Sequence, residues 1–341
     1  MTTCVHPFQN EIDMDYGLII DKPSGITSHD VVARVRRFAG TRRVGHAGTL
    51  DPFATGVLIV CVGRTTRLVQ FLVGLDKEYV ATIRLGFSTD TQDLTGKQIS
   101  SLTPSNELDK GAIDKMLKEF VGPQKQIPPM YSAKKVAGQR LYRAARAGLE
   151  VDRSPADIEV YSISSDVPGG DIGLTENADG TVDFVVRIQC SSGTYVRTLA
   201  NDIGVRLGVG AHLAALRRTA VGGFRIEAAA ELADLEAKNN SPVEALADGL
   251  ATPRIIPNGR LTPAELVSHL PHIELDEEKV LRVRNGQSVR VDGSRLGPIR
   301  DGASVGLLGP GRVLIGVGGY SEKAAAILPT VVIGQAGVGS V

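Results

Sequence analysis

The chain has 341 residues, which corresponds to about two domains at ~150 residues each. Hydrophobic residues make up 42% and charged residues 22%, as in proteins that bury a core, so large-scale disorder is excluded. Lysine plus arginine equals aspartate plus glutamate at 38 each, so a polyanionic partner would have to be bound by local charge.

The cysteines and the apolar segments indicate the cellular compartment in which the protein is expected. The cysteines, Cys4, Cys61 and Cys190, lie far apart and form no CxxC pair, which indicates neither a disulfide framework nor a zinc site. The N-terminus has no apolar core typical of a signal peptide. The longest apolar stretch, around Val57 to Val62, is too short to cross a bilayer. We therefore expect a soluble cytoplasmic protein with no metal and no membrane partner.

The first third of the chain contains strand-like and helix-like segments in turn. Leu18 to Ile20 predicts a short buried strand that ends at a Pro-Ser-Gly turn. Helical spacing of apolar residues follows, with Ser28 or His29 as the expected cap. A second strand is expected over 79–85, and a helix over 108–120.

The second half predicts a further strand, a helix and an appended module. Residues 182–190 alternate apolar and polar, as a half-buried strand does, and a loop then leads into a helix. Mixed strands and helices in this order predict an α+β architecture. Asparagine, proline, alanine and glycine over 239–259 indicate a linker, and the glycine-punctuated strands after it predict a small, mostly β module.

The loop GHAGTLDPFATG, residues 45–56, surrounds one carboxylate, Asp51, with three glycines and a proline. Glycine lets a backbone turn sharply or approach a ligand closely, and Pro52 fixes the chain after the acid. An isolated Asp-Pro pair would indicate only a turn in which Asp51 bonds its own backbone. The long glycine-bracketed segment, with Arg42, Arg43 and His46 upstream, favours a functional site instead.

Five segments together resemble the TruB family of pseudouridine synthases. They are GLIIDKPSGITSHDVV, GHAGTLDPFATGVL, KEYVATIRLGFSTDTQDLTG, SSGTYVRTLANDIG and GAHLAALRRTAVG, in the family's order over roughly residues 17 to 226. One motif would support a hypothesis, whereas five in the same order make a chance match improbable.

The resemblance implies a fold and an activity. The expected catalytic domain covers 1–250, has a central mixed or antiparallel sheet and carries an RNA-clasping insertion at about 122–153, while 260–341 forms a PUA-like RNA-binding domain. The implied reaction converts uridine-55 in the TΨC arm of tRNA to pseudouridine by base flipping. The implied enzyme is a monomer of the stand-alone bacterial type, which needs no cofactor, protein partner or guide RNA.

The same resemblance assigns catalytic roles to Asp51, Tyr79 and Arg197. Asp51 matches the family's nucleophilic aspartate, and it can act either by covalent addition or by taking a proton. Tyr79 matches the tyrosine that stacks on the target base and assists proton removal from C5. Arg197 matches the arginine that pairs with the aspartate, lowers its pKa and keeps it ionised.

Further positions are implied to contact the substrate. Tyr195 and Leu216 match apolar pocket positions around the flipped base, although Leu216 also suits plain core packing. His46 corresponds to a histidine that fills the gap left by the extruded nucleotide. Asp93 either orients Arg197 through a salt bridge or is an ordinary turn aspartate.

Local charge answers the objection raised by the zero net charge. Seven arginines occur between Arg34 and Arg67, with Asp51 as the one acid there. The insertion over 122–153 is also basic and contains Tyr131 and Tyr142, so cations are interleaved with aromatic rings that can stack on bases. Lys134 and Arg143 are the substrate-binding candidates within it. A solvated charged face is the alternative for any one of these residues.

Three other functions compete with this interpretation. A guide-RNA-dependent pseudouridine synthase would share the aspartate loop, but the basic insertion favours the stand-alone type. An RNA-folding chaperone would not need Asp51, Tyr79 and Arg197 together. An aspartate-based hydrolase lacks a second carboxylate motif or metal-ligand spacing, and GxxxxGK[ST] is absent, so no nucleotide cofactor is indicated.

Overall fold

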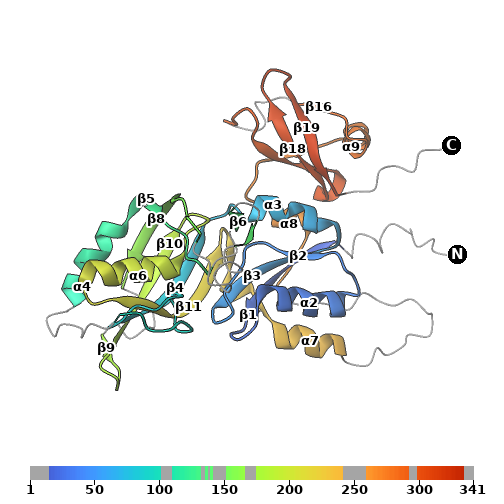
Figure 1. Cartoon of the computed structure of the whole chain (residues 1–341). Helices are drawn as coiled ribbons and strands as arrows, with labels where there is room; N and C mark the ends of the chain where they lie inside the picture. The colour runs from blue at the N-terminus through green and yellow to red at the C-terminus, as the bar shows by residue number, and fades with distance from the viewer. Residues whose placement is uncertain are drawn as a thin grey trace.

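The computed structural model shows two large β-sheets with helices packed against them, and a separate two-stranded sheet (Figure 1). It describes residues 15–100, 110–131, 135–136, 139–140, 151–165, 174–240, 259–291 and 298–333. Within these ranges a 12-stranded sheet forms the larger body and a five-stranded sheet lies toward the C-terminus. The expected α+β class, with a mixed central sheet and a small C-terminal β domain, is confirmed. No helix in the described ranges is long and apolar enough to cross a membrane.

The large sheet has two halves that meet where β3 (Thr55–Val62) lies beside β11 (Ala211–Val221). The strand order is β13-β1-β3-β11-β4-β10-β8-β5. The contact between β3 and β11 is parallel and pairs only Arg217 with Thr55 and Arg218 with Gly56. Because so few residues are paired, the two strands diverge on either side of this junction. The junction therefore determines where loops from both halves can meet.

The N-terminal half consists of β1 (Tyr16–Lys22), α2 (Ser28–Ala39), β2 (Val44–His46) and β3. β1 and β2 both pair antiparallel with β3, and α2 packs beside them. The helix begins one residue earlier than expected, because Thr27 and not Ser28 or His29 is its cap. Thr27 and Asp30 form a reciprocal capping box that satisfies the first backbone N–H groups of the helix.

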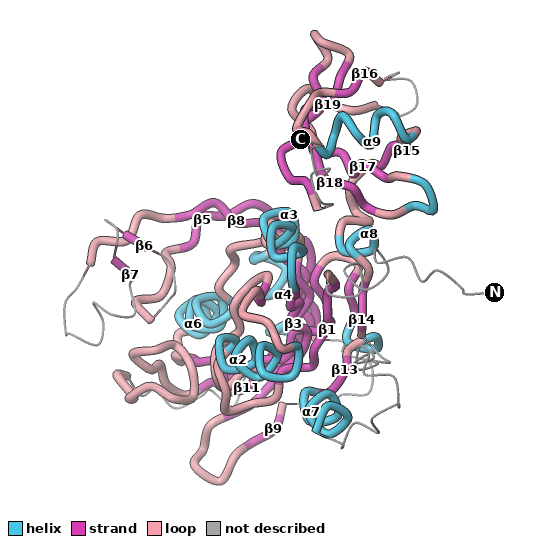
Figure 2. Tube along the Cα trace, turned by 90° about the vertical axis from the view of Figure 1, so that its right-hand side faces the viewer, coloured by secondary structure: helices cyan, strands magenta, loops and turns pink. Residues whose placement is uncertain are grey.

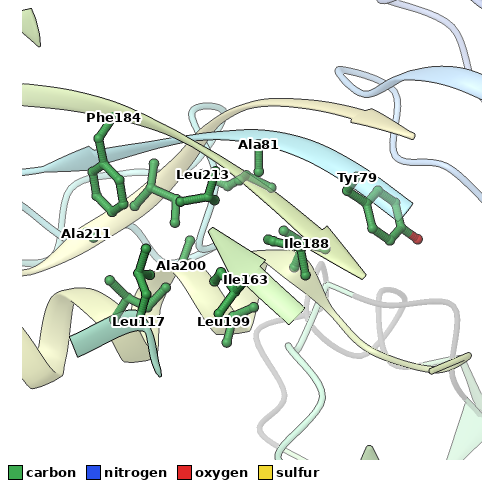
Figure 3. Close-up of a cluster of buried hydrophobic side chains, with 14 of the residues drawn as sticks. Tyr79, Ala81, Leu117, Ile163, Phe184, Ile188, Leu199, Ala200, Ala211 and Leu213 are labelled. Carbon is green, nitrogen blue, oxygen red and sulfur yellow. The ribbon is translucent and has the colours of Figure 1, made fainter. Parts of the chain in front are cut away.

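The second half is built from β4 (Lys77–Leu85), β8 (Ala156–Ser164), β10 (Val182–Cys190), α6 (Val196–Leu207) and β11. β10 has the predicted bounds and the predicted alternation, with Phe184, Val186 and Ile188 buried. These side chains pack with residues of α6 and β4 in one hydrophobic cluster (Figure 3). Tyr79 lies at one end of that cluster, with its hydroxyl directed away from the apolar side chains (Figure 3).

The C-terminal sheet has the order β15-β17-β18-β19-β16 and contacts the larger body. Its bounds are β15 (His272–Glu274), α9 (Glu277–Arg284), β16 (Val289–Arg290), β17 (Ser304–Leu308), β18 (Leu314–Ser321) and β19 (Ala326–Val332). Leu314 and Val331 share a buried cluster with Leu72 of the larger body. Arg64 and Arg67 donate hydrogen bonds to backbone carbonyls at the end of β19, Ile333 and Val332 respectively. The module is therefore fastened to the large sheet by apolar packing and by two arginines.

The remaining elements are short. They are η1 (Gly63–Leu68), α3 (Val69–Leu72), α4 (Lys110–Leu117), η2 (Lys118–Phe120), β5 (Gly122–Gln126), β6 (Lys135–Val136), β7 (Gln139–Arg140), β9 (Thr175–Glu176), β12 (Phe224–Arg225), η3 (Ile226–Ala228), β13 (Ala230–Glu231), α7 (Leu232–Asn240), β14 (Arg260–Leu261), α8 (Pro263–Leu266) and η5 (Pro310–Arg312). β14 pairs with β1, so the first residues after the predicted linker belong to the large sheet. Figure 2 shows α2 and α7 on the same side of the molecule.

Candidate active site

The loop that carries Asp51 connects β2 to β3 and approaches β11 closely. Gly56 has a φ of 104°, and a Cβ there would lie 2.2 Å from the carbonyl oxygen of Arg218. Only glycine fits this contact, because any side chain would clash with the β11 backbone. The Ala54 N–H donates to the Asp51 carbonyl at 3.1 Å, which closes the expected Asp-Pro turn. The carboxylate of Asp51 points away from this turn and toward Arg197.

The segment after β1 holds the Asp51 loop from one side. The Lys22 ammonium is buried and donates to the carbonyls of Pro23, Ile26 and Pro52. Ser28 uses its hydroxyl twice, because it accepts from the Leu50 N–H at 2.9 Å and donates to the Leu50 carbonyl. These bonds fix the residues immediately before and after Asp51.

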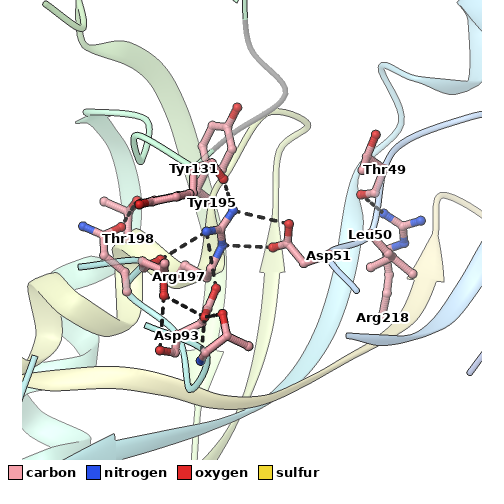
Figure 4. A network of polar contacts seen from close by, with 12 residues as sticks. Thr49, Leu50, Asp51, Asp93, Tyr131, Tyr195, Arg197, Thr198 and Arg218 are labelled. Carbon is pink, nitrogen blue, oxygen red and sulfur yellow. Dashed lines mark hydrogen bonds and ion pairs between the residues drawn. The ribbon is translucent and has the colours of Figure 1, made fainter. Parts of the chain in front are cut away.

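Arg197 in the first turn of α6 binds Asp51 from the other side (Figure 4). Its Nε lies 2.9 Å from Asp51 Oδ2, and its Nη2 lies 3.3 Å from Asp51 Oδ1. The same Nη2 donates to the Tyr131 carbonyl at 2.7 Å, and Nη1 donates to the Thr91 carbonyl at 3.1 Å. Since the Arg197 side chain is only 5% exposed, these partners replace water in stabilising its positive charge.

Asp93 is the second carboxylate on Arg197. Its Oδ2 lies 3.4 Å from Arg197 Nη1. Its Oδ1 accepts from the hydroxyl of Thr91 at 2.8 Å and from the backbone N–H and hydroxyl of Thr95 at 2.9 and 2.6 Å. Asp93 therefore fulfils both alternatives, because one carboxylate oxygen closes a turn and the other pairs with Arg197.

One cavity of about 850 Å³ contains most of the predicted site residues. Asp51, Tyr79, Asp93, Tyr195, Arg197 and Leu216 all line it. Tyr131 and Arg218 line it as well, and so does His29 at the start of α2. Residues from both halves of the sheet thus meet around Asp51. A second cavity, between the large sheet and the C-terminal module, contains none of the predicted residues.

The electrostatics around Asp51 differ from the sequence-based expectation in one respect. Arg197 does lower the pKa of Asp51, as expected. Burial has the larger effect, however, and together with the nearby Asp93 carboxylate it raises the pKa of Asp51 above its ordinary value. Burial thus increases the proton affinity of the Asp51 carboxylate, and Arg197 limits that increase.

Three predicted substrate contacts are not placed in this cavity. His46 lies at the end of β2 behind His29, with the two ring centroids 5.3 Å apart, and it is absent from the cavity lining. Burial lowers the pKa of His46 to about 4, so it is neutral at physiological pH. Lys134 and Arg143 lie outside the residues whose side chains the structure describes.

Sequence reasoning missed three buried residues that support the site. Arg218 is 1% exposed and donates to carbonyls of the Asp51 loop. Lys22 holds the same loop from the opposite side, and burial lowers the pKa of its ammonium to about 8. Gln126 forms two hydrogen bonds with the backbone of Tyr195. Lys22 and Arg218 lie within the resembling motifs, and Gln126 lies in the predicted insertion, but no supporting role was assigned to Gln126 because its partner is distant in sequence.

The described residues contain no group of three or more histidine, cysteine, aspartate or glutamate side chains arranged to hold a metal ion. The ionisable side chains that line the cavity include two carboxylates, two guanidinium groups and three phenols, from Asp51, Asp93, Arg197, Arg218, Tyr79, Tyr131 and Tyr195.

Comparison with known proteins places this chain in a family. The model of the TruB family pseudouridylate synthase N-terminal domain matches residues 36–196, and that of the tRNA pseudouridylate synthase B C-terminal domain matches 197–252. The tRNA pseudouridine synthase B of Thermobifida fusca is 46% identical over 87% of this chain and 92% of its own length. This chain belongs to the TruB family of tRNA pseudouridine synthases. It is accordingly an isomerase.

A further relative supports the TruB assignment over most of the chain, and a solved structure supports the fold. The tRNA pseudouridine synthase B of Leifsonia xyli is 41% identical over 91% of this chain and 94% of its own length. Among solved structures, Cbf5 in a Cbf5-Nop10-Gar1 complex superposes with a TM-score of 0.70 and 26% identity, covering 97% of this chain and 88% of that one. Because the likeness extends over 97% of the chain, the C-terminal β domain is part of the shared architecture.

Proposed function

We propose that this enzyme converts uridine-55 in the TΨC arm of tRNA to pseudouridine, with Asp51 as the nucleophile. The observation that carries the proposal is the Asp51–Arg197 ion pair in a cavity lined by Tyr79, Tyr195 and Leu216. Relatives named tRNA pseudouridine synthase B support tRNA as the substrate. The reaction exchanges a C–N bond for a C–C bond within one nucleotide, so it requires no oxidant, reductant or cofactor.

The position of Asp51 suits attack on the ribose. Its carboxylate is about a third exposed, on the side that faces the cavity, while Arg197 holds both of its oxygens. A carboxylate fixed in this way can add to C1′ as the bond to N1 breaks and leaves its electron pair on the base. Arg197 serves to orient the attacking group and to keep it ionised against the effect of burial.

The aromatic and apolar lining suits a flipped uracil. Tyr79 and Leu216 are nearly buried and lie on neighbouring strands β4 and β11, so they present a flat, water-poor surface. Flipping a nucleotide costs a few kcal/mol of lost stacking. Stacking on an aromatic ring recovers ~1–3 kcal/mol per base. We propose that Tyr79 contacts the base face and takes the proton from C5.

Exposed cations away from the cavity suit the tRNA backbone. Arg37, Arg42 and Arg43 are exposed at and after the C-terminal end of α2, whose N-terminal end lines the cavity. α2 has 12 residues and is therefore ~18 Å long. An RNA stem bound at the cavity could reach these arginines over that distance. We propose that they, the insertion with Lys134 and Arg143, and a PUA-like C-terminal domain contact phosphates, and that His46 supports the gap left by the flipped base.

Tritium release tests the proposal. The purified chain alone, without metal, guide RNA or protein partner, is incubated with tRNA carrying tritium at C5 of uridine. We expect one equivalent of tritium per tRNA from the wild type and none from Asp51→Asn. A tRNA with cytidine at position 55 is the matched substrate control and should release none.

The outcomes separate the competing functions. Binding of tRNA without release would overturn the isomerase proposal for this substrate and favour an RNA-folding role. Release that persists in Asp51→Asn would identify a different nucleophile, and release from the cytidine-55 tRNA would identify a different target position.

A further inference from the structure

Arg218 is a buried cation without a carboxylate partner. Its side chain is 1% exposed, yet it forms no ion pair with any acid in the described part of the chain. Its three hydrogen bonds go to backbone carbonyls: Nε donates to Val57 at 2.8 Å, Nη2 to Gly48 at 3.2 Å and Nη1 to Thr49 at 3.4 Å. An uncompensated charge is costly to bury, so its retention in a cavity wall calls for a negative group that is present only during the reaction.

The register of the sheet places this charge beside Tyr79. Arg218 on β11 and Tyr79 on β4 are directly opposite in the antiparallel pairing, so both side chains project from the same face of the sheet. Both line the cavity that contains Asp51. The same guanidinium therefore touches the Asp51 loop through Gly48 and Thr49 and lies next to the phenol. Arg197 has no comparable position, since its partners are Asp51 and Asp93.

We propose that Arg218 is a positioning residue that stabilises Tyr79 as a phenolate, the base that removes the proton from C5. This inference rests on the proposed function. Burial has the largest effect on Tyr79 and raises its pKa above the ordinary value, whereas the Arg218 guanidinium beside it lowers that pKa and so opposes the effect of burial. Without a neighbouring cation, a phenol in so apolar a position would hold its proton too tightly to act as a base.

The step balances without any added reactant. After C5 bonds to C1′ and the Asp51 carboxylate leaves, C5 carries both the sugar and its original hydrogen, and N1 is doubly bonded to C6. The Tyr79 phenolate takes the C5 hydrogen as a proton. The C5–H electron pair forms the C5=C6 bond, the former N1=C6 electrons return to N1, and N1 takes up a proton. Tyr79 then returns its proton to solvent.

The test is a primary deuterium isotope effect on pseudouridine formation. Single-turnover rates are measured with tRNA containing ordinary or 5-deuterated uridine, for the wild type, Arg218→Met, Arg218→Lys and Arg217→Met. Arg217 is the matched control, because it is the neighbouring arginine and pairs with Asp21 outside the cavity. We expect Arg218→Met to slow the reaction by ~10²-fold or more, the scale of a lost proton-transfer step. Its isotope effect should exceed that of the wild type, because C5 deprotonation becomes rate-limiting.

Arg218→Lys keeps a positive charge without the three-way hydrogen bonding, so we expect an intermediate rate and an intermediate isotope effect. A slowed reaction with an unchanged isotope effect in both variants would overturn the proposal, because Arg218 would then act only by holding the Asp51 loop. If Arg218→Met does not fold, Arg218→Lys carries the same test. A wild type that forms no pseudouridine would instead overturn the proposed function. The two failures are distinguishable, because the role of Arg218 is tested only by variants of an active wild type.

Discussion

The two walls of the active-site cavity each contain a buried arginine, and the two differ in how their charge is balanced. On the α6 wall, Arg197 is held between Asp51 and Asp93. On the β11 wall, Arg218 is equally buried but bonds only to carbonyls. The positive charge of a guanidinium between two carboxylates is more than balanced by them, whereas a guanidinium bonded only to carbonyl dipoles keeps its positive potential. The α6 wall therefore orients the proposed nucleophile, while the β11 wall supplies a positive potential.

The same difference predicts how each arginine contributes to folding. Removing Arg197 leaves two carboxylates close to each other, of which Asp93 is buried and Asp51 is about a third exposed. Removing Arg218 leaves three carbonyls without their donors but also removes an unpaired buried charge. The first loss is the more costly, because uncompensated charges are harder to bury than uncompensated carbonyls.

Arg197→Met should have the largest effect. We expect destabilisation by ~3–5 kcal/mol, as for a broken buried ion pair, and loss of measurable pseudouridine formation. Arg218→Met should cost less, ~1–3 kcal/mol for unsatisfied backbone acceptors. Urea unfolding of both variants beside the wild type measures the difference. Equal losses in the free energy of unfolding would show that the carboxylate partners of Arg197 do not make its removal more costly than the removal of Arg218.

Tyr79→Phe should reduce catalysis strongly and leave the fold intact. The phenyl ring keeps its packing, so tRNA affinity and the midpoint of unfolding should stay near wild type. The single-turnover rate should fall by ~10²–10⁴-fold, because the group that removes the C5 proton is lost. Rapid-quench kinetics with saturating enzyme measure this rate. A change confined to affinity would mean that Tyr79 only stacks on the base.

Asp93→Asn should move the pH profile. The proposed mechanism requires ionised Asp51, so activity should fall as the pH falls through the pKa of that group. Asp93 raises the pKa of Asp51, hence its neutralisation should shift the acidic limb of the single-turnover rate to lower pH. Rates between about pH 4 and pH 8 show the limb, and Arg217→Met serves as a charge-change control with no expected shift. A limb that moves to higher pH would mean that Asp93 acts mainly by holding Arg197 against Asp51.

Arg64→Ala should have the smallest effect, because it lies outside both walls. Its bond to the Ile333 carbonyl helps to fasten the C-terminal module, alongside apolar packing that remains. We expect a loss of ~0.5–1 kcal/mol in binding of full-length tRNA, roughly 2–5-fold in Kd. Filter binding should show this with full-length tRNA and not with an isolated T-arm stem-loop. Equal losses on both RNAs would place the effect in the catalytic domain.

Much of the fold was predictable where the signal is local. The bounds of β10 follow from strict alternation over nine residues, because the two faces of that strand meet different surroundings. The helix start was displaced by one residue, since threonine, serine and histidine follow one another and only Thr27 has an acid at the position that completes a capping box.

For the site, the sequence by itself predicted which residues carry the chemistry, because Asp51, Tyr79 and Arg197 lie in motifs with a distinctive local pattern. It also predicted the aspartate–arginine pair, and the structure brings the two together at 2.9 Å. The tertiary structure decided which buried residues support them. Gln126 and Arg218 become partners of Tyr195 and of the Asp51 loop only when β5 and β11 take their places in the sheet. Burial decided the pKa of Asp51 as well, because desolvation depends on every chain segment that excludes water from the carboxylate and not on its sequence neighbours.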